Sequence, residues 1–236
     1  DLYQHIDPEQ VGNTMRMLVS DMAGRASVEL KARELGIDLG GDRELVGRIV
    51  ERVKERERRG YTYEAADASF ALLLRAEAGA GPVPYFRIES WRMIAEGLPD
   101  GIHANGATVK LRVGGRRVIS TAEGRGPVDA LDNALREALG RFYPELAVFE
   151  LVDYRVRILQ GAHGTGSPAR VLVTTSDGTV RWSTVGVGDN VVAASWQALQ
   201  DAVTYGLLRR GVPPADEDRR PGPAAPFPQT ALVTAS

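Results

Sequence analysis

Two stretches of this chain decide its fold, because they repeat each other. Residues 116–139 read "RRVISTAEGRGPVDALDNALREAL", and residues 180–203 read "VRWSTVGVGDNVVAASWQALQDAV". Gly124 aligns with Gly188, and the pair Ala134-Leu135 aligns with Ala198-Leu199. Each stretch runs from strand-like residues through a glycine-containing turn into an amphipathic helix. The alignment therefore predicts two copies of one structural unit.

The repeat extends towards the N-terminus of each copy. "FRIESWRM" (86–93) aligns with "FELVDYRV" (149–156), and "ATVKLRV" (107–113) aligns with "ARVLVTT" (169–175). The apolar residues alternate with a period of two, which is typical of strands with one buried face. Gly114-Gly115 and the run from Ser176 to Gly178 are hairpin signals. Each unit is therefore predicted to be β-β-β-α.

A single three-stranded sheet has one apolar face and only one helix to cover it. Two such units related by a pseudo-twofold axis can pack their helices between the sheets and close one core. We therefore predict an α+β protein, in which this pair of repeats follows small helical linker subdomains. Three helices are expected in the linker part, over 25–36, 43–59 and 65–77.

Composition sets the expected domain boundaries. "GAGPVP" (79–84) reads as a connection, and 6 of the 13 prolines follow Gly211 without any hydrophobic periodicity. We expect linker subdomains over 1–80, a regulatory unit over 84–210 and a disordered tail over 211–236.

Composition also limits the function classes. The 236 residues carry a formal net charge of -2 and no cysteine, which excludes disulfides, zinc fingers and thiol catalysis. No basic stripe favours nucleic acid, and no apolar run approaches the roughly 20 residues of a membrane helix. Together with the lack of a signal peptide, these features favour the cytoplasm. We expect no metal site in this chain.

The turn "EGRGPVDA" (123–130) raises a choice between binding and structure. No Lys-Ser/Thr pair follows it, which excludes a Walker loop, and an acid in the first helical turn would repel phosphate. A purely structural connection is one reading, with Pro127 opening the helix and Asp129 favouring its dipole. The alternative is a site for a zwitterion, in which free N–H groups bind a carboxylate and Asp129 binds an ammonium. Ala193 aligns with Asp129, so the two repeats would differ as sites.

Several motifs together carry a resemblance to a known family. They are "HIDPEQVGN", "KARELGIDL", "EGRGPVDALDNALREALGRFYPEL", "DYRVRIL" and "VGVGDNVVAASWQAL". Over about residues 1–210 the chain resembles the C-terminal half of the 2-isopropylmalate synthase family, and the wording leans towards the citramalate branch. Members of this family condense acetyl-CoA with a 2-oxoacid, by implication pyruvate, on an N-terminal TIM barrel that holds a divalent metal.

The resemblance implies roles for three residues near the N-terminus. In the family, a His and an Asp of the linker assist catalysis over the partner's barrel, and these map to His5 and Asp7. Asn13 maps near the CoA end. The His would act as a general base and the Asp would orient it. The barrel is absent from these 236 residues, so we expect no condensation by this chain alone.

The resemblance also implies a dimerising regulatory domain that binds an end-product amino acid between the repeats. The implied ligand is isoleucine in the citramalate branch, and leucine in the isopropylmalate alternative. A free-standing amino-acid-binding module is the remaining alternative, and a homodimer is the expected assembly. The implied effector-binding residues are Gly124, Gly126, Val128 and Asp129 at the first helix start, Leu151, Tyr154 and Ile158 on the fourth strand, and Asp189 and Val191 at the second helix start.

Overall fold

The computed structural model describes residues 24–80, 85–97, 103–159 and 167–216. His5, Asp7 and Asn13, to which the sequence assigned catalytic and CoA-side roles, lie outside the described residues.

The first described part consists of three helices. They are α1 (Arg25–Glu34), α2 (Arg43–Arg58) and α3 (Asp67–Arg75), followed by the single π-helical turn η2 (Ala76–Ala80). The carboxylate of Asp42 caps α2 by accepting the N–H groups of Glu44 and Leu45 at 2.8 and 3.0 Å. The apolar stripe of α2 is buried against α1 and α3, as the i, i+3, i+4 spacing predicts. All three predicted helices are present, with ends that differ by one or two residues.

The remaining described part consists of two copies of one unit. The first contains β1 (Arg87–Gly97), β2 (His103–Val113), β3 (Arg116–Gly124) and α4 (Pro127–Gly140). After the 3₁₀ turn η3 (Pro144–Val148), the second contains β4 (Glu150–Ile158), β5 (Ala169–Ser176), β6 (Arg181–Gly188) and α5 (Val191–Arg209). Each sheet is an antiparallel meander, in the orders β1-β2-β3 and β4-β5-β6. The predicted α+β fold with β-β-β-α repeats is confirmed.

The two units share a detail that was not evident from the sequence. The register between the first two strands shifts at Ile88/Ser90 in the first sheet and at Leu151/Asp153 in the second. These positions align in the repeat, so the same bulge recurs in both copies. A bulge bends a strand and increases its twist, and it precedes Trp91 in one copy and Tyr154 in the other.

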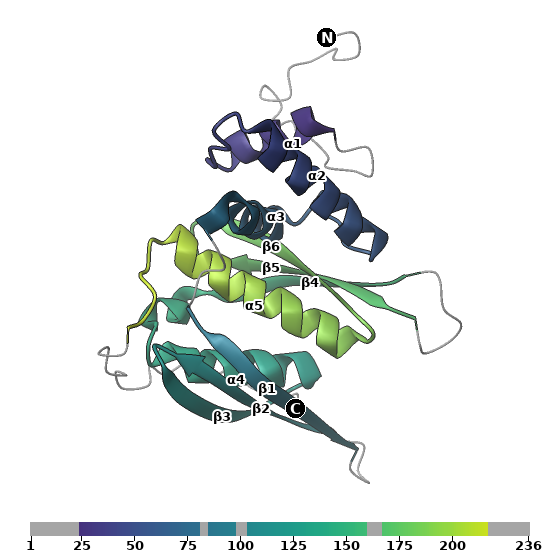
Figure 1. The fold of residues 1–236 in the computed structure, drawn as a ribbon. Helices are drawn as coiled ribbons and strands as arrows, with labels where there is room; N and C mark the ends of the chain where they lie inside the picture. Colours follow the sequence, from purple (N-terminus) through teal and green to yellow (C-terminus); the bar gives the residue numbers. More distant parts are fainter. Residues whose placement is uncertain (1–23, 81–84, 98–102, 160–166, 217–236) are drawn as a thin grey trace.

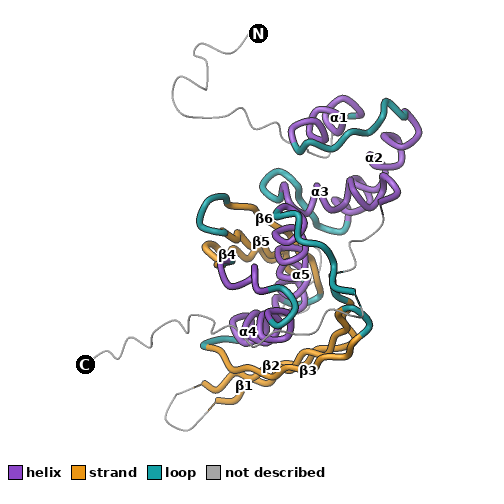
Figure 2. Tube along the Cα trace, turned by 90° about the vertical axis from the view of Figure 1, so that its left-hand side faces the viewer, coloured by secondary structure: helices purple, strands orange, loops and turns teal. Residues whose placement is uncertain are grey.

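Helices α4 and α5 lie between the two sheets (Figures 1 and 2). Alternate residues of β2, including Val109 and Leu111, are fully buried against the apolar face of α4. Trp91 of β1 and Trp196 of α5 meet across the core with ring centroids 6.0 Å apart. One hydrophobic core thus unites both repeats, which neither unit could close by itself.

Two glycines allow each helix to approach its sheet closely. A Cβ on Gly124 would lie under 3.0 Å from backbone atoms of Asp129 and Ala130, and one on Gly188 would lie 2.9 Å from the amide nitrogen of Ala194. Both glycines end the third strand of their unit. Their alignment in the sequence therefore reflects a packing requirement at the strand-to-helix turn.

The part of the chain that contains α1, α2 and α3, here called the helical segment, covers the edge of the second sheet at β6. The hydroxyl of Ser69 accepts the N–H of Val185 at 3.0 Å, and the side-chain oxygen of Gln197 accepts the N–H of Val187 at 3.1 Å. Tyr61 donates to the same oxygen of Gln197 at 2.8 Å. Side chains thus satisfy amide groups that an open edge strand would expose.

Residues 211–216, which the sequence placed in a disordered tail, instead pack on the core. Val212 and Ala215 are buried. The hydroxyl of Tyr85 donates to the carbonyl of Val212 at 2.7 Å, and the N–H of Ala215 donates to the hydroxyl of Tyr143 at 2.9 Å. Val212 and Ala215 are two isolated apolar residues without periodic spacing, so the sequence pattern did not indicate that they are buried. Residues 217–236 lie outside the described residues.

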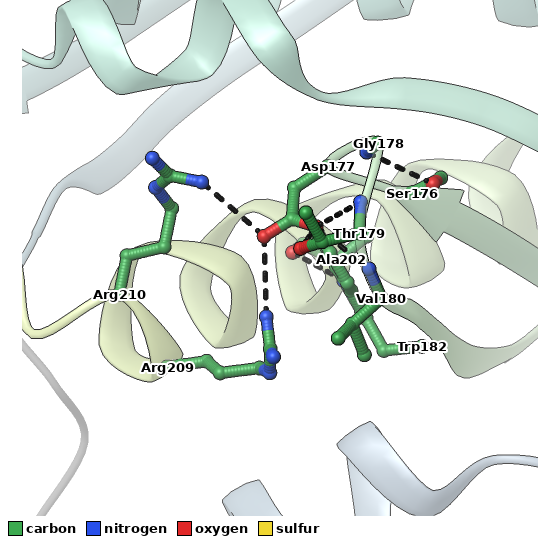
Figure 3. A network of polar contacts seen from close by, with 9 residues as sticks. All are labelled: Ser176, Asp177, Gly178, Thr179, Val180, Trp182, Ala202, Arg209 and Arg210. Carbon is green, nitrogen blue, oxygen red and sulfur yellow. Dashed lines mark hydrogen bonds and ion pairs between the residues drawn. The ribbon is translucent and has the colours of Figure 1, made fainter.

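The β5–β6 hairpin is held by one carboxylate (Figure 3). Oδ1 of Asp177 accepts the N–H groups of Thr179 and Val180 at 3.0 and 2.9 Å. Oδ2 contacts the guanidinium groups of Arg209 and Arg210 at 3.1 and 3.2 Å. These donors, led by the N–H of Val180, hold the pKa of Asp177 well below its usual range. The hairpin is thereby tied to the end of α5.

Candidate functional site

A pocket of about 780 Å³ lies between α4 and the segment that joins η3 to β4. This volume is in the range of small-molecule sites. Four of the residues that the sequence assigned to effector binding line it, namely Val128, Asp129, Leu151 and Tyr154. The other lining residues are Arg125, Asp132, Asn133, Arg136, Ala147, Val148, Phe149 and Glu150.

One face of α4 forms the polar wall. Asp132 and Asn133 follow Asp129 by three and four positions, and Arg136 follows them by four and three. This spacing places the side chains on the same side of a helix. The opposite wall comes from η3 and the start of β4. The pocket therefore combines a charged helix face with a largely apolar strand.

The beginning of α4 is open to a ligand. Its N-cap residue is Gly126, and no side chain caps the helix. Asp129 lies in the first turn, and its Oδ2 accepts the N–H of Arg125 at 2.9 Å, while the guanidinium of Arg125 is 3.9 Å away. The carboxylate therefore closes the turn and still faces the pocket.

The second repeat differs at the equivalent place. The side chain of Asn190 caps α5 by accepting the N–H of Ala193 at 2.9 Å. A capped helix start has fewer amide groups to offer an anion. The sequence difference between Asp129 and Ala193 thus coincides with a difference in capping.

The apolar wall is fixed by a hydrogen-bonded tyrosine. The hydroxyl of Tyr154 is 2.7 Å from the hydroxyl of Ser195, which donates to the carbonyl of Val191 at 2.6 Å. This chain of contacts joins β4 to the first turn of α5. Tyr154 can therefore present its ring to the pocket while its polar end is satisfied.

A buried ion pair that the sequence analysis did not single out forms part of the polar wall. Nε of Arg136 lies 2.7 Å from Oδ2 of Asp132, and Nη1 of Arg136 donates to the carbonyl of Phe149 at 2.5 Å. Both side chains are about nine-tenths buried, with 11% and 12% exposed. The pair joins α4 to the start of β4 and so sets the width of the pocket. The sequence signal that could have indicated this ion pair is the spacing of four residues between an acid and a base on one helix.

Five of the residues assigned to effector binding do not line this pocket: Gly124, Gly126, Ile158, Asp189 and Val191. Gly124 is occupied in helix packing, while a Cβ on Gly126 would meet no atom within 4 Å. Ile158 points to the same side of β4 as Tyr154 but is 56% exposed. Asp189 is exposed before α5, and Val191 packs against the core while its carbonyl accepts the hydroxyl of Ser195.

The described residues include neither a metal centre nor a membrane-spanning helix. Among them, no group of three or more His, Cys, Asp or Glu side chains is arranged to hold a metal ion. None of the helices they form is both long and apolar enough to cross a membrane.

Comparison with known proteins identifies a family domain that matches most of the described chain. The LeuA allosteric (dimerisation) domain matches residues 64–207. This match begins before residue 84, where the sequence placed the start of the regulatory unit, and so includes α3.

Over 216 residues the chain is 73% identical to the (R)-citramalate synthase of Streptomyces coelicolor, which covers 92% of this chain and 40% of that protein. It is 45% identical to the (R)-citramalate synthase of Geobacter sulfurreducens and 41% identical to that of Aquifex aeolicus, each over 208 residues, 88% of this chain and 39% of the relative. The chain thus spans about two fifths of the length of these relatives.

Proposed function

This chain belongs to the family of the LeuA allosteric (dimerisation) domain, and on that premise we propose that it is the C-terminal regulatory part of an (R)-citramalate synthase and binds isoleucine for feedback inhibition. The relatives bearing that enzyme name support the enzyme assignment. The single observation that carries the binding proposal is the pocket, which sets an uncapped helix start and Asp129 beside an apolar strand.

The chemistry of the pocket suits a free aliphatic amino acid. The amide N–H groups at the start of α4 would donate hydrogen bonds to the α-carboxylate, and the helix dipole also favours negative charge there. Asp129 would accept the α-ammonium in a charge-assisted hydrogen bond. Leu151 and Tyr154 line the opposite wall, and Val128 extends the apolar surface on α4, where a branched side chain would pack.

Titration calorimetry of the 236-residue chain with isoleucine, leucine and valine tests this proposal. We expect isoleucine to bind most tightly, with leucine weaker by at most about two orders of magnitude, because misplacing one methyl group is worth roughly 1–3 kcal/mol. Tighter binding of leucine would favour the isopropylmalate synthase alternative. Absence of heat with all three amino acids would contradict the proposed binding function.

Catalysis is proposed only for a longer protein. There, His5 would act as a general base on the acetyl methyl group, Asp7 would orient it, and Asn13 would lie near the bound acetyl-CoA. A divalent metal would polarise the 2-oxoacid when bound on the barrel. The chain alone, mixed with acetyl-CoA, pyruvate and a divalent metal, is expected to form no citramalate, and formation above the buffer blank would contradict this.

A free-standing amino-acid-binding module, the other alternative, would have no barrel encoded upstream of Asp1.

We also propose that the chain forms a homodimer, which the name of the matching domain supports. The reducing cytoplasm suits a chain without cysteine, and we propose that the protein acts there.

A further inference from the structure

One buried oxygen in the pocket wall has no partner. Oδ1 of Asp132 is shielded from solvent and accepts no hydrogen bond within the described part of the chain, and Asp132 is a buried residue that lines the pocket. A carboxylate oxygen that is removed from water and left unpaired is costly, so such an oxygen in a native fold calls for an explanation.

The neighbouring arginine does not supply the missing bond. Arginine and a carboxylate often pair through two parallel hydrogen bonds that use both oxygens. Here Nε of Arg136 donates to Oδ2 of Asp132, while Nη1 donates to the carbonyl of Phe149 and not to Oδ1. The ion pair therefore explains the position of Asp132 but leaves Oδ1 without a hydrogen-bond donor.

The charges of the pocket indicate what would satisfy this oxygen. Asp129, Asp132 and Glu150 line it together with Arg125 and Arg136, so three acids face two bases. Arg136 is already paired with Asp132, and Arg125 is mostly exposed, with 69% of its side chain accessible. The excess of one negative charge favours a positively charged group at this position, and such a group can supply the missing donor.

The spacing of the two helical acids fits an ammonium group. Asp129 and Asp132 are three residues apart on one face of α4, where Cβ atoms lie about 5–6 Å from each other. An ammonium has three N–H donors, and its bonds to carboxylates are about 2.7–2.9 Å long. A single ammonium between the two side chains can therefore reach both carboxylates.

We propose that Asp132 is a second ligand-binding carboxylate in this pocket, and that its side chain shifts on binding so that the unpaired Oδ1 accepts the α-ammonium of the amino acid together with Asp129. This inference rests on the proposed function and adds a specificity-determining residue to it. It makes the site selective for amino acids over the corresponding 2-oxo, 2-hydroxy and des-amino acids, which have the same carboxylate and side chain.

The test compares two ligands on the full 236-residue chain by calorimetry. Isoleucine carries the ammonium, and 3-methylpentanoic acid has the same carbon skeleton without it. We expect Asp132→Asn to weaken isoleucine binding at least tenfold, because a charge-assisted hydrogen bond is lost. Binding of 3-methylpentanoic acid should stay within twofold of wild type.

Glu137→Gln is the matched control, because it removes one negative charge from α4 at a residue that does not line the pocket. It should leave both affinities within twofold. An equal loss of isoleucine binding in Glu137→Gln and Asp132→Asn would mean that any loss of negative charge on α4 weakens binding, and this would overturn the proposal.

Two further outcomes would also overturn it. Unchanged isoleucine affinity in Asp132→Asn would show that Oδ1 does not meet the ligand. Equal weakening of both ligands would show that Asp132 acts only through Arg136 on the shape of the wall. If Asp132→Asn fails to fold, the double variant Asp132→Asn/Arg136→Gln replaces the ion pair by a neutral hydrogen-bonded pair, and the same comparison between ligands applies. Failure of the proposed function looks different, because wild type itself would then bind no branched-chain amino acid.

Discussion

The hydroxyl of Ser69 on α3 donates to the carboxylate of Asp201 on α5 at 2.9 Å, and the same oxygen accepts the N–H of Val185. One side chain of the helical segment therefore holds both a helix and a strand of the second repeat. Burial raises the pKa of Asp201 to about 6, although the hydrogen bond from Ser69 and the charge of Arg56 oppose this shift. The contact between α3 and the second repeat thus contains a carboxyl group, that of Asp201, whose protonated form is favoured by burial.

Asp201→Asn is expected to stabilise the protein at pH 7. A carboxyl group whose pKa is raised on folding contributes stability below its unfolded value of about 4, and this contribution is lost as the pH rises through about 6. Asn keeps an acceptor for Ser69 without the cost of a buried charge. We expect a gain of about 1–3 kcal/mol at pH 7 that disappears near pH 4, measured by thermal melting. Glu96→Gln, at an exposed side chain of β1, is the control. A lower melting temperature of Asp201→Asn at pH 7 would contradict the prediction.

Asp177→Asn is expected to have the opposite dependence on pH. The pKa of Asp177 is lowered on folding, so its contribution is present above the unfolded value of about 4 and is lost as the pH falls below it. Asn can still accept the N–H groups of the hairpin but loses the attraction of Arg209 and Arg210. The melting temperature should fall by a few degrees at pH 7, and the difference should shrink towards pH 3. A difference that is constant over this range would mean that the charge of Asp177 does not matter.

The repeat made most of the fold predictable. Aligned glycines and period-two strands indicated the β-β-β-α units, and the caps and apolar spacing indicated the helices. The contacts between the helical segment and the second repeat were not predictable, because they depend on single polar side chains such as Ser69 and Gln197. A hydroxyl that covers a sheet edge leaves no periodic signal in the sequence.

The candidate site was predictable only in part. The resemblance pointed to Val128, Asp129, Leu151 and Tyr154, and all four line one pocket. Asp132 and Arg136 were missed, because a helical acid–base pair four residues apart is most often a solvated surface feature. Their burial follows from η3, which brings the carbonyl of Phe149 over α4, and no local pattern encodes that contact.

Asp129→Asn should weaken isoleucine binding about tenfold or more, because the ammonium loses a charged acceptor. Asn retains an oxygen that can accept the N–H of Arg125, so the turn before α4 should persist. The melting temperature should therefore change little, since the dipole interaction of an exposed acid is worth a few tenths of a kcal/mol to about 1 kcal/mol. Calorimetry with both proteins measures the effect, and equal affinities would assign Asp129 to helix initiation alone.

Val156→Asp is expected to disrupt the proposed homodimer. Val156 pairs with the buried Val171 and so points to the core side of its sheet, yet it is 43% exposed. An apolar residue on that side favours cover by a second copy. Light scattering at tens of micromolar should give a dimer for wild type and a monomer for Val156→Asp. Ile94→Asp is the control, because Ile94 is 47% exposed on the outer side of the other sheet. A monomeric wild type, or dissociation of both variants, would contradict this assignment.

The two glycines of the α4 turn are expected to respond differently to the same substitution. A Cβ on Gly124 would clash with the backbone of Asp129 and Ala130, so Gly124→Ala should destabilise the fold by about 1–3 kcal/mol. Gly126 has φ of -156° and open space around its Cβ, so Gly126→Ala should cost at most about 1 kcal/mol as a poorer N-cap. If the carboxylate of isoleucine approaches the start of α4, that added methyl group occupies part of its path. Gly126→Ala should then bind isoleucine several-fold more weakly while melting close to wild type, whereas unchanged binding would place the ligand away from the helix start.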